Sequence, residues 1–144
     1  MNRTTSDGAF SLTNSNITAQ LTFSTNFFKP IPGEDLETNP GCFGKDLANW
    51  LSAKLVERGM AVERVIPEDF GWVILLSRKP FLVWVGCCNV ESSLTEWTIF
   101  PVVEAPFFKR LFKSVDPIPE LDKVTAYLSD IVALMPGVTS VSWQ

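Results

Sequence analysis

Two pairs of adjacent carboxylates are the side chains of this sequence best suited to chemistry. Glu34-Asp35 and Glu68-Asp69 both stand beside a proline or glycine, in segments predicted to be turns. Two carboxyl groups that face each other across a cleft can hydrolyse a glycosidic bond. Neighbours in sequence do not have that geometry, whereas a pair assembled from both turns would. The more ordinary interpretation is that these acids accept hydrogen bonds from backbone amides and fix the turns.

The sequence contains no histidine. This removes Ser-His-Asp and Cys-His catalysis, most catalytic zinc sites and the usual general base near neutral pH. Its eight glycines are scattered and form no phosphate-binding loop of the common kinds. We therefore predict no catalytic residue, no metal site and no cofactor.

Three cysteines are present, at positions 42, 87 and 88. Cys87 and Cys88 are neighbours in an apolar run that is typical of a strand, so their side chains should point to opposite faces and act as small hydrophobes. Cys42 is expected in the first turn of a helix, where the helix dipole would lower its thiol pKa. Whether Cys42 is reactive stays open. An odd number of cysteines without a secretory signal indicates free thiols in a reducing compartment.

Three tryptophans, Trp72, Trp84 and Trp97, fall on consecutive predicted strands. The tight turn between the first two strands predicts that Trp72 and Trp84 are cross-strand neighbours. If all three faced one side, they would form either core or an aromatic floor for a ligand or partner. Burial in the core is the commoner outcome for large aromatic side chains.

The chain carries a net charge of −4. Its one dense basic cluster, Lys109-Arg110-Lys113, is too small a footprint for nucleic-acid binding, so we expect no nucleic-acid partner. An acidic surface suits a basic protein partner, which it would attract electrostatically. It is equally compatible with simple solubility.

The amino-terminal residues give no targeting signal. Residues 1–15 are polar and lack an apolar stretch, so they predict a flexible tail rather than a signal peptide. The longest apolar runs are far shorter than the roughly 20 residues of a membrane helix. We expect a cytoplasmic protein with no membrane contact, whose residues 16–144 form a single domain.

Hydrophobic periodicity predicts the elements of that domain. Residues 17–23 alternate apolar and polar, as in a half-buried strand. A helix should begin at Asn39-Pro40 and end near Gly59, with an apolar stripe at helical spacing between them. Strands are expected at 61–66, 70–77, 81–88 and 96–103, the last with Pro101 at an edge or a bulge.

The last third of the chain is predicted to be mainly helical. A short amphipathic piece over 105–112 precedes a helix that opens at Asp116-Pro117 and stops at Pro136-Gly137, and 138–143 suits a final strand. The short connections between strands imply antiparallel pairing. The fold class is therefore α+β: an antiparallel sheet of about four to six strands, packed against one long helix in the N-terminal half and a C-terminal helix.

Several short motifs resemble a family of small uncharacterised bacterial cytoplasmic proteins. They are Pro32-Gly-Glu-Asp35, Asn39-Pro-Gly41, Glu68-Asp-Phe-Gly-Trp72 and Trp84-Val-Gly-Cys87, and the resemblance runs from about Phe23 to Trp143. It implies no function. In size, acidity, lack of histidine and aromatic content the chain is also similar in type to immunity proteins that neutralise toxins delivered between bacteria.

These observations favour a non-catalytic protein-binding domain, an immunity or inhibitor protein that covers a toxin or effector by surface complementarity. The alternative is a small-ligand-binding or carboxylate-based hydrolytic domain, with a pocket near both acidic pairs and Trp72. A third possibility is a structural subunit that dimerises through residues 101–112. The binding candidates are Glu34, Asp35, Glu68, Asp69, Trp72, Trp84 and Trp97.

Overall fold

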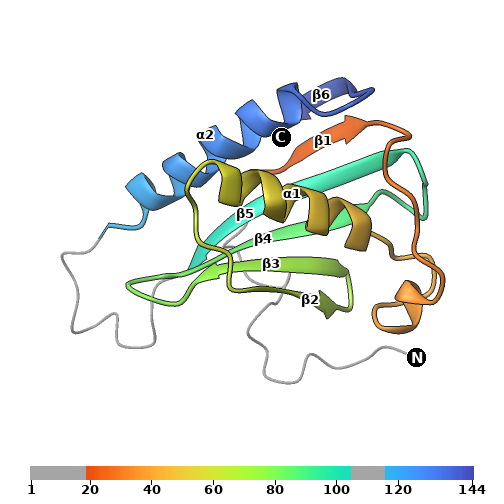
Figure 1. Ribbon diagram of the computed structural model, residues 1–144, viewed down its shortest axis with the longest axis horizontal. Coiled ribbons are helices and arrows are strands. Elements are labelled where there is room, and N and C mark those ends of the chain that lie inside the picture. Colours follow the sequence, from red (N-terminus) through yellow and green to blue (C-terminus); the bar gives the residue numbers. More distant parts are fainter. Residues whose placement is uncertain (1–18, 105–115) are drawn as a thin grey trace.

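The computed structural model describes residues 19–104 and 116–144 as six strands and two α-helices with one short 3-10 helix (Figure 1). The elements in chain order are β1 (Leu21–Ser24), the 3-10 helix η1 (Glu34–Leu36), α1 (Lys45–Glu57), β2 (Arg64–Glu68), β3 (Gly71–Ser77), β4 (Leu82–Asn89), β5 (Glu96–Glu104), α2 (Ile118–Ala133) and β6 (Thr139–Trp143).

The strands form one antiparallel sheet in the order β2-β3-β4-β5-β1-β6. Consecutive hairpins join β2 to β5, because the segments between these strands are too short for anything but a turn. The first strand then inserts between β5 and the last strand, β6. The predicted α+β fold with an antiparallel sheet and two packed helices is confirmed.

Both helices lie on the same face of the sheet (Figure 1). Their apolar stripes pack on alternate strand residues to form the main core, in which Leu47, Leu51 and Leu128 are fully buried. The opposite face carries a smaller cluster, formed by Val73, Leu75, Trp84, Phe100 and Val102.

The start of α1 corrects a prediction. The helix begins at Lys45, six residues after Asn39, because Gly41 at φ +81° and Gly44 at φ +151° hold the intervening backbone in a conformation that no helix contains. Cys42 therefore lies in the loop before the helix and not in its first turn.

Pro101 sits within β5, which is an internal strand. Among the described residues, the pairing between β1 and β5 covers residues 96–99 of β5, and Pro101 follows this stretch. The prediction that Pro101 places this strand at an edge or a bulge is therefore wrong, because β5 lies between β4 and β1 and its register with β4 is regular. The end of α2 and the final strand occur where the sequence predicts them.

Two predicted features, the flexible tail over residues 1–15 and the amphipathic piece over 105–112, lie outside the described residues. Among the helices that the structure describes, none combines the length and the apolar character needed to cross a membrane.

Candidate functional site

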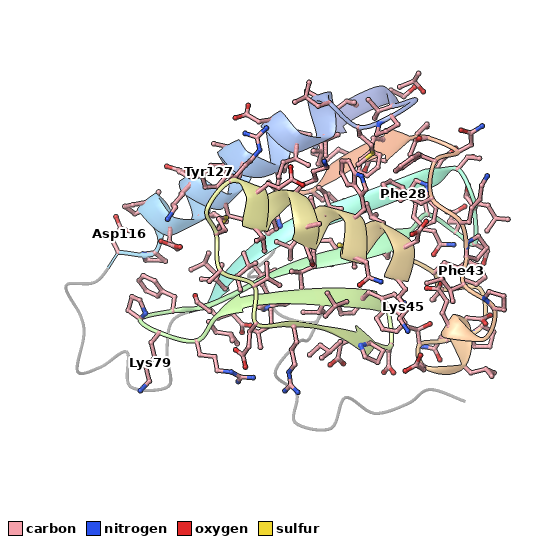
Figure 2. The ribbon with its side chains drawn as sticks, viewed as in Figure 1. Phe28, Phe43, Lys45, Lys79, Asp116 and Tyr127 are labelled. Carbon is pink, nitrogen blue, oxygen red and sulfur yellow. The ribbon has the colours of Figure 1, made fainter. Side chains whose placement is uncertain are left out.

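Several loops meet at one end of the sheet, on the right in Figure 1. They are the long connection over 25–44 between β1 and α1, the β2–β3 turn over 69–70, and the β4–β5 turn over 90–95. Phe43 and Lys45 lie at this end, and Lys79 and Asp116 lie at the other (Figure 2). The loop end is therefore built from parts of the chain that are far apart in sequence.

Glu34 holds the long connection onto the start of α1. One carboxylate oxygen, Oε2, accepts hydrogen bonds from the amides of Gly44 at 3.1 Å and Lys45 at 3.0 Å, and Oε1 accepts one from Ile31 at 2.7 Å. The side chain is buried. A buried carboxylate at a helix N-terminus satisfies amides that have no partner within the helix, so Glu34 acts as a cap supplied from ten residues away.

Asp35 and Asn39 fix the next part of the same connection. Asp35 Oδ2 accepts a hydrogen bond from the Gly41 amide at 3.1 Å. Asn39 Nδ2 donates to the backbone oxygen of Asp69 at 3.0 Å and so joins this segment to the β2–β3 turn. The residue pairs Glu34-Asp35 and Glu68-Asp69 thus lie at the same end of the molecule.

Asn89 joins the connection to the β4–β5 turn. Its side-chain oxygen accepts a hydrogen bond from the Phe43 amide at 3.0 Å, and its Nδ2 donates to the backbone oxygens of Gly41 and Ser93, both at 2.9 Å. The oxygen and both N–H groups of this buried side-chain amide therefore form hydrogen bonds with the loops. The connection and the turn therefore form one hydrogen-bonded unit.

The β4–β5 turn has an unusual backbone. Glu91 at φ 47° and Ser92 at φ 63° are consecutive non-glycine residues in the left-handed region, and the Ser93 amide closes the turn onto the Val90 oxygen at 2.8 Å. Such turns normally carry asparagine and glycine at these positions. Two strained residues in succession persist only where the surroundings fix them.

The loop end packs tightly against β4. A Cβ atom on Gly44 would lie 2.6 Å from the Cys87 backbone oxygen, and one on Gly71 would lie 2.5 Å from the same atom. Both glycines also have positive φ angles. The close approach of the two loops to β4 therefore depends on the absence of side chains at these two positions.

Trp72 lies beneath Lys45 at this end. The Lys45 ammonium is 4.9 Å from the centre of the Trp72 ring and 3.8 Å from Glu37 Oε2. Trp72 itself is buried and packs in the main core on the helix-covered face.

Of the other two predicted tryptophans, Trp97 shares the main core with Trp72, and Trp84 lies on the opposite face of the sheet. Trp72 is opposite Cys87, and Trp84 is opposite Leu75, so the expected cross-strand pairing of Trp72 with Trp84 is wrong. Trp84 belongs to the opposite face, where its Nε1 donates to Glu104 at 2.8 Å. Trp97 is buried in the main core and donates from Nε1 to the Thr25 oxygen at 3.2 Å. The three rings form no common floor.

The thiols are poor nucleophiles at neutral pH. Burial raises the pKa of Cys42, and the neighbouring Asp35 and Asp69 raise it further, although a hydrogen bond with the Asn39 backbone opposes them. The expected lowering of the Cys42 pKa is therefore wrong, because the residue is not in a helix. Burial likewise raises the pKa of Cys88 to about 12 and that of Cys87 well above 9.0.

Charge is distributed unevenly along the molecule. Of the residues that the structure describes, the loop end holds eight of the fifteen acidic residues but only two of the eight basic residues. The other described residues include seven acidic and six basic residues, which nearly balance. The acidic residues at the loop end are Glu34, Asp35, Glu37, Asp46, Glu68, Asp69, Glu91 and Glu96, and the basic residues there are Lys29 and Lys45.

Apolar side chains are exposed among these acids. Leu36, on η1, is 86% exposed, and Phe27, Ile31 and Leu94 are also large apolar residues on the surface. We call this end of the molecule, with its eight acids and four exposed apolar residues, the acidic loop end; Glu34 and Glu68 are buried within it. Leu36, Leu94, Glu37 and Glu91 were not singled out by the sequence, where only their position in predicted loops signalled surface exposure.

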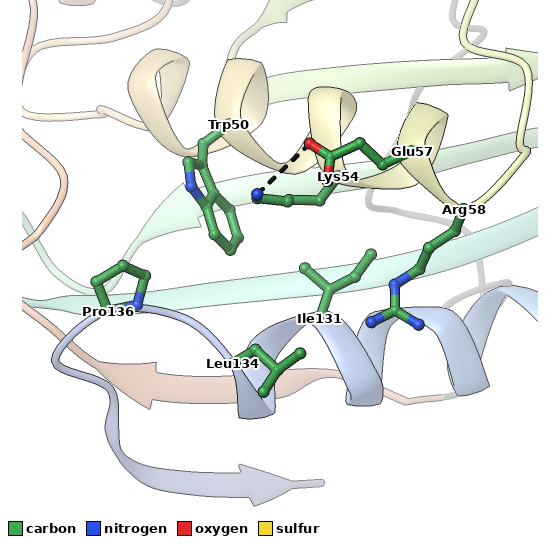
Figure 3. A pocket seen from close by; sticks show the side chains of 7 residues that line it. All are labelled: Trp50, Lys54, Glu57, Arg58, Ile131, Leu134 and Pro136. Carbon is green, nitrogen blue, oxygen red and sulfur yellow. Dashed lines mark hydrogen bonds and ion pairs between the residues drawn. The ribbon is translucent and has the colours of Figure 1, made fainter.

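A separate hollow of about 230 Å³ lies between the two helices (Figure 3). Trp50, Lys54 and Arg58 line it from α1 and the residue following it, and Ile131 and Leu134 line it from α2 and its end. The Lys54 ammonium lies 3.4 Å from Glu57 and 5.6 Å from the centre of the Trp50 ring. None of the predicted acidic residues lines this hollow.

Within residues 19–104 and 116–144, no group of His, Cys, Asp and Glu side chains could hold a metal ion. Comparison with protein-family models, with curated proteins and with solved structures finds no match for the chain.

Proposed function

We propose that this chain is a non-catalytic protein-binding domain, an immunity or inhibitor protein that neutralises a bacterial toxin or effector by covering part of its surface. The binding surface in this proposal is the acidic loop end, and the partner presents a basic, partly apolar patch. The observation that carries the proposal is the excess of six negative charges at one end of a small domain, interspersed with exposed apolar side chains.

Charge of one sign gathered on one surface supports rapid and selective association. A field of this kind steers an oppositely charged protein toward the surface and repels partners of the wrong charge. A toxin that acts on nucleic acid needs basic surface to bind phosphate, and an acidic cover complements such a surface. The other described residues carry seven acidic and six basic residues, so the attraction is directed to the acidic loop end.

The exposed apolar residues at this end can supply affinity, which charge alone supplies only weakly. Interfaces obtain most of their affinity from a few large side chains that become buried, and Leu36 is the most exposed large apolar residue among those described. The hydrogen bonds of Glu34, Asp35 and Asn89 fix the loops before any partner arrives. A surface fixed in advance loses less conformational entropy on binding.

The chemistry of the same residues favours binding over catalysis. Glu34 and Asp35 use carboxylate oxygens to hold backbone amides, and the thiols have raised pKa values. The chain contains no histidine, so the usual general base near neutral pH is absent. We place the protein in the cytoplasm, where its three free cysteines stay reduced.

The test is capture of the partner followed by protection from it. The wild-type chain and two variants, Glu37→Lys and Leu36→Ser, are used as baits in extracts of the native host, and each captured protein is purified. We expect one basic protein that binds the wild-type chain, binds both variants at least tenfold more weakly, and arrests growth unless the wild-type chain is coexpressed. Its association rate falls with added salt.

Asp122→Lys and Val56→Ser are the matched controls, since both residues are exposed and lie outside the acidic loop end. They make the same change of charge or of apolar area, so they leave affinity and protection unchanged. Capture of no protein, or equal loss of affinity with the control variants, would refute the proposal.

A carboxylate-based hydrolytic or small-ligand site is the second candidate. It is favoured by the shared position of Glu34-Asp35 and Glu68-Asp69 beside Trp72. Assay of a glycoside library separates the two functions, because the second candidate predicts turnover by the wild-type chain that Glu68→Gln with Asp69→Asn abolishes, whereas the main proposal predicts no turnover by either chain. Turnover by the wild-type chain that this variant lacks would establish the second candidate.

A further inference from the structure

The last strand, β6, forms one edge of the sheet and lies at the outer margin of the molecule (Figure 1). All five of its residues are exposed, including Val141 at 48% and Trp143 at 36%. Its sequence, Thr-Ser-Val-Ser-Trp, contains neither a charge nor a proline. Exposed edges with neutral, β-forming residues are templates for further strands.

The opposite edge differs. Strand β2 includes Arg64 and Pro67, and proline cannot donate a ladder hydrogen bond. Charged residues and prolines at an edge are the usual means of preventing a further strand from pairing. One edge of this sheet is therefore protected and the other is open.

The register of β6 shows which of its backbone groups face outward. Gln20 and Gln144 exchange two hydrogen bonds, at 3.0 and 2.8 Å, so Gln144 directs its backbone toward the β1 side. Because these groups alternate along an antiparallel strand, Ser142 also faces β1, and Trp143 and Val141 face away. Before Val141 the left-handed Ser140, at φ 55°, interrupts the strand.

We infer that β6 is a self-association surface, on which a second copy of this chain adds its own β6 in antiparallel orientation. The two-fold axis passes between Ser142 and its equivalent. Val141 of each copy is then opposite Trp143 of the other, and these pairs exchange four backbone hydrogen bonds. The result is one continuous sheet across both copies.

Two properties of β6 favour its pairing with the β6 of a second copy. It has no charge, so two copies meet without repulsion between like charges. Each Val141–Trp143 pair places a β-branched side chain beside an aromatic one, which is among the favourable cross-strand combinations. Trp143 is already held, since its Nε1 donates to Ser129 Oγ at 3.0 Å.

The contact is short, since Ser140 limits the regular ladder to the last residues of the strand. An interface of this size lies at the low end of the range for specific complexes. We therefore expect a weak dimer in rapid exchange with the monomer, with a mass in light scattering that rises with concentration toward twice the 16.1 kDa of one chain.

The test places a charged side chain at Ser142, which lies next to its equivalent across the two-fold axis. Ser142→Lys places two like charges opposite each other and should keep the chain monomeric at concentrations where the wild type dimerises, and Ser142→Glu should do the same. A mixture of the two variants should form the heterodimer. Asn49→Lys, an equivalent change at an exposed position of α1, should dimerise as the wild type does.

Sedimentation velocity and circular dichroism give the readouts, the second showing that each variant is folded. A wild-type chain that stays monomeric up to its solubility limit would overturn the inference. So would a dimer that both Ser142 variants retain, or variants that stay apart when mixed. The acidic loop end takes no part in this contact, so failure here leaves the proposed function untouched.

Discussion

Asn39 and Asp69, thirty residues apart in sequence, are joined by a hydrogen bond of 3.0 Å from the Asn39 side-chain amide to the Asp69 backbone oxygen. The sequence Asn39-Pro40 resembles the start of a helix, but the Asn39 side chain instead donates a hydrogen bond from one loop to another. This bond is what connects the 25–44 segment with the β2–β3 turn, and it keeps both acidic pairs in one surface.

Replacement of Asn39 should therefore loosen the acidic loop end without unfolding the protein. We expect Asn39→Ala to lower the free energy of unfolding by about 1 kcal/mol, the typical net value of one such hydrogen bond. Amide hydrogen exchange should become faster in residues 36–42 and 68–70. Asn49→Ala, on the exposed face of α1, is the control, and equal exchange rates in both variants would contradict the structural role.

Replacement of Glu34 by glutamine should lower the stability of the protein far more than the same replacement at an exposed glutamate. In Glu34→Gln one carboxylate oxygen becomes an NH2 group that faces backbone N–H donors, so at least one buried amide loses its acceptor. We expect a loss of about 2 kcal/mol in urea unfolding, in the range for hydrogen bonds to charged groups. Glu57→Gln on the exposed end of α1 should change stability little.

Gly86 makes room for Phe100. A Cβ atom on Gly86 would lie 2.2 Å from the Phe100 ring, in the cluster on the face opposite the helices. Gly86→Ala should cost about 1–3 kcal/mol, the range for overpacking of a core. Phe100→Leu in the same chain should recover part of that loss, so the two substitutions should be non-additive in a thermal or urea unfolding cycle.

The buried thiols should make stability depend on pH in the alkaline range. Burial raises the pKa of Cys88 from 9.0 to about 12. The unfolded chain then releases a proton that the folded chain retains, so the contribution is complete below pH 9.0 and is lost as the pH rises toward 12. Urea unfolding over this range should show a steeper decline for the wild type than for Cys88→Ala.

Thiol reagents give an independent check of the same property. Cys87 is fully buried, and both Cys87 and Cys88 have raised pKa values, so the folded protein should react slowly with a maleimide near neutral pH. All three cysteines should react rapidly in denaturant. Rapid modification of Cys87 in the folded state would contradict the described core.

Much of the fold follows from local patterns in the sequence. The stripe of α2 and the alternation of β1 each reflect burial on one side, which periodicity reports directly. The start of α1 escaped prediction because its cap is Glu34, a residue outside the helix whose position depends on the folded loop. Asn39-Pro40 has the local features of a helix start, but Glu34 and the left-handed Gly41 and Gly44 outweigh them.

The site was predicted only in part. Both acidic pairs lie at one end because Glu34-Asp35 belong to the connection after β1, Glu68-Asp69 lie at the end of β2, and these two strands end on the same side of the sheet. The position of Trp84 depends on where the β3–β4 hairpin turns, and the pairing of Trp72 with Cys87 shifts Trp84 by an odd number of residues onto the other face. That register, like the exposure of Leu36, depends on the folded structure and not on the local sequence.

The position of β1 between β5 and β6 has a consequence for folding. Leu21 pairs with Trp143 at one side and with Ile99 at the other, so the first strand can take its place only when much of the later chain is available. Pairings over such sequence separations impose a large entropic cost before they stabilise anything, and they slow folding. On the ribosome, β2 to β5 can form hairpins as they emerge. Strand β1 is synthesised first, but both of its partners are complete only after β6 has been synthesised.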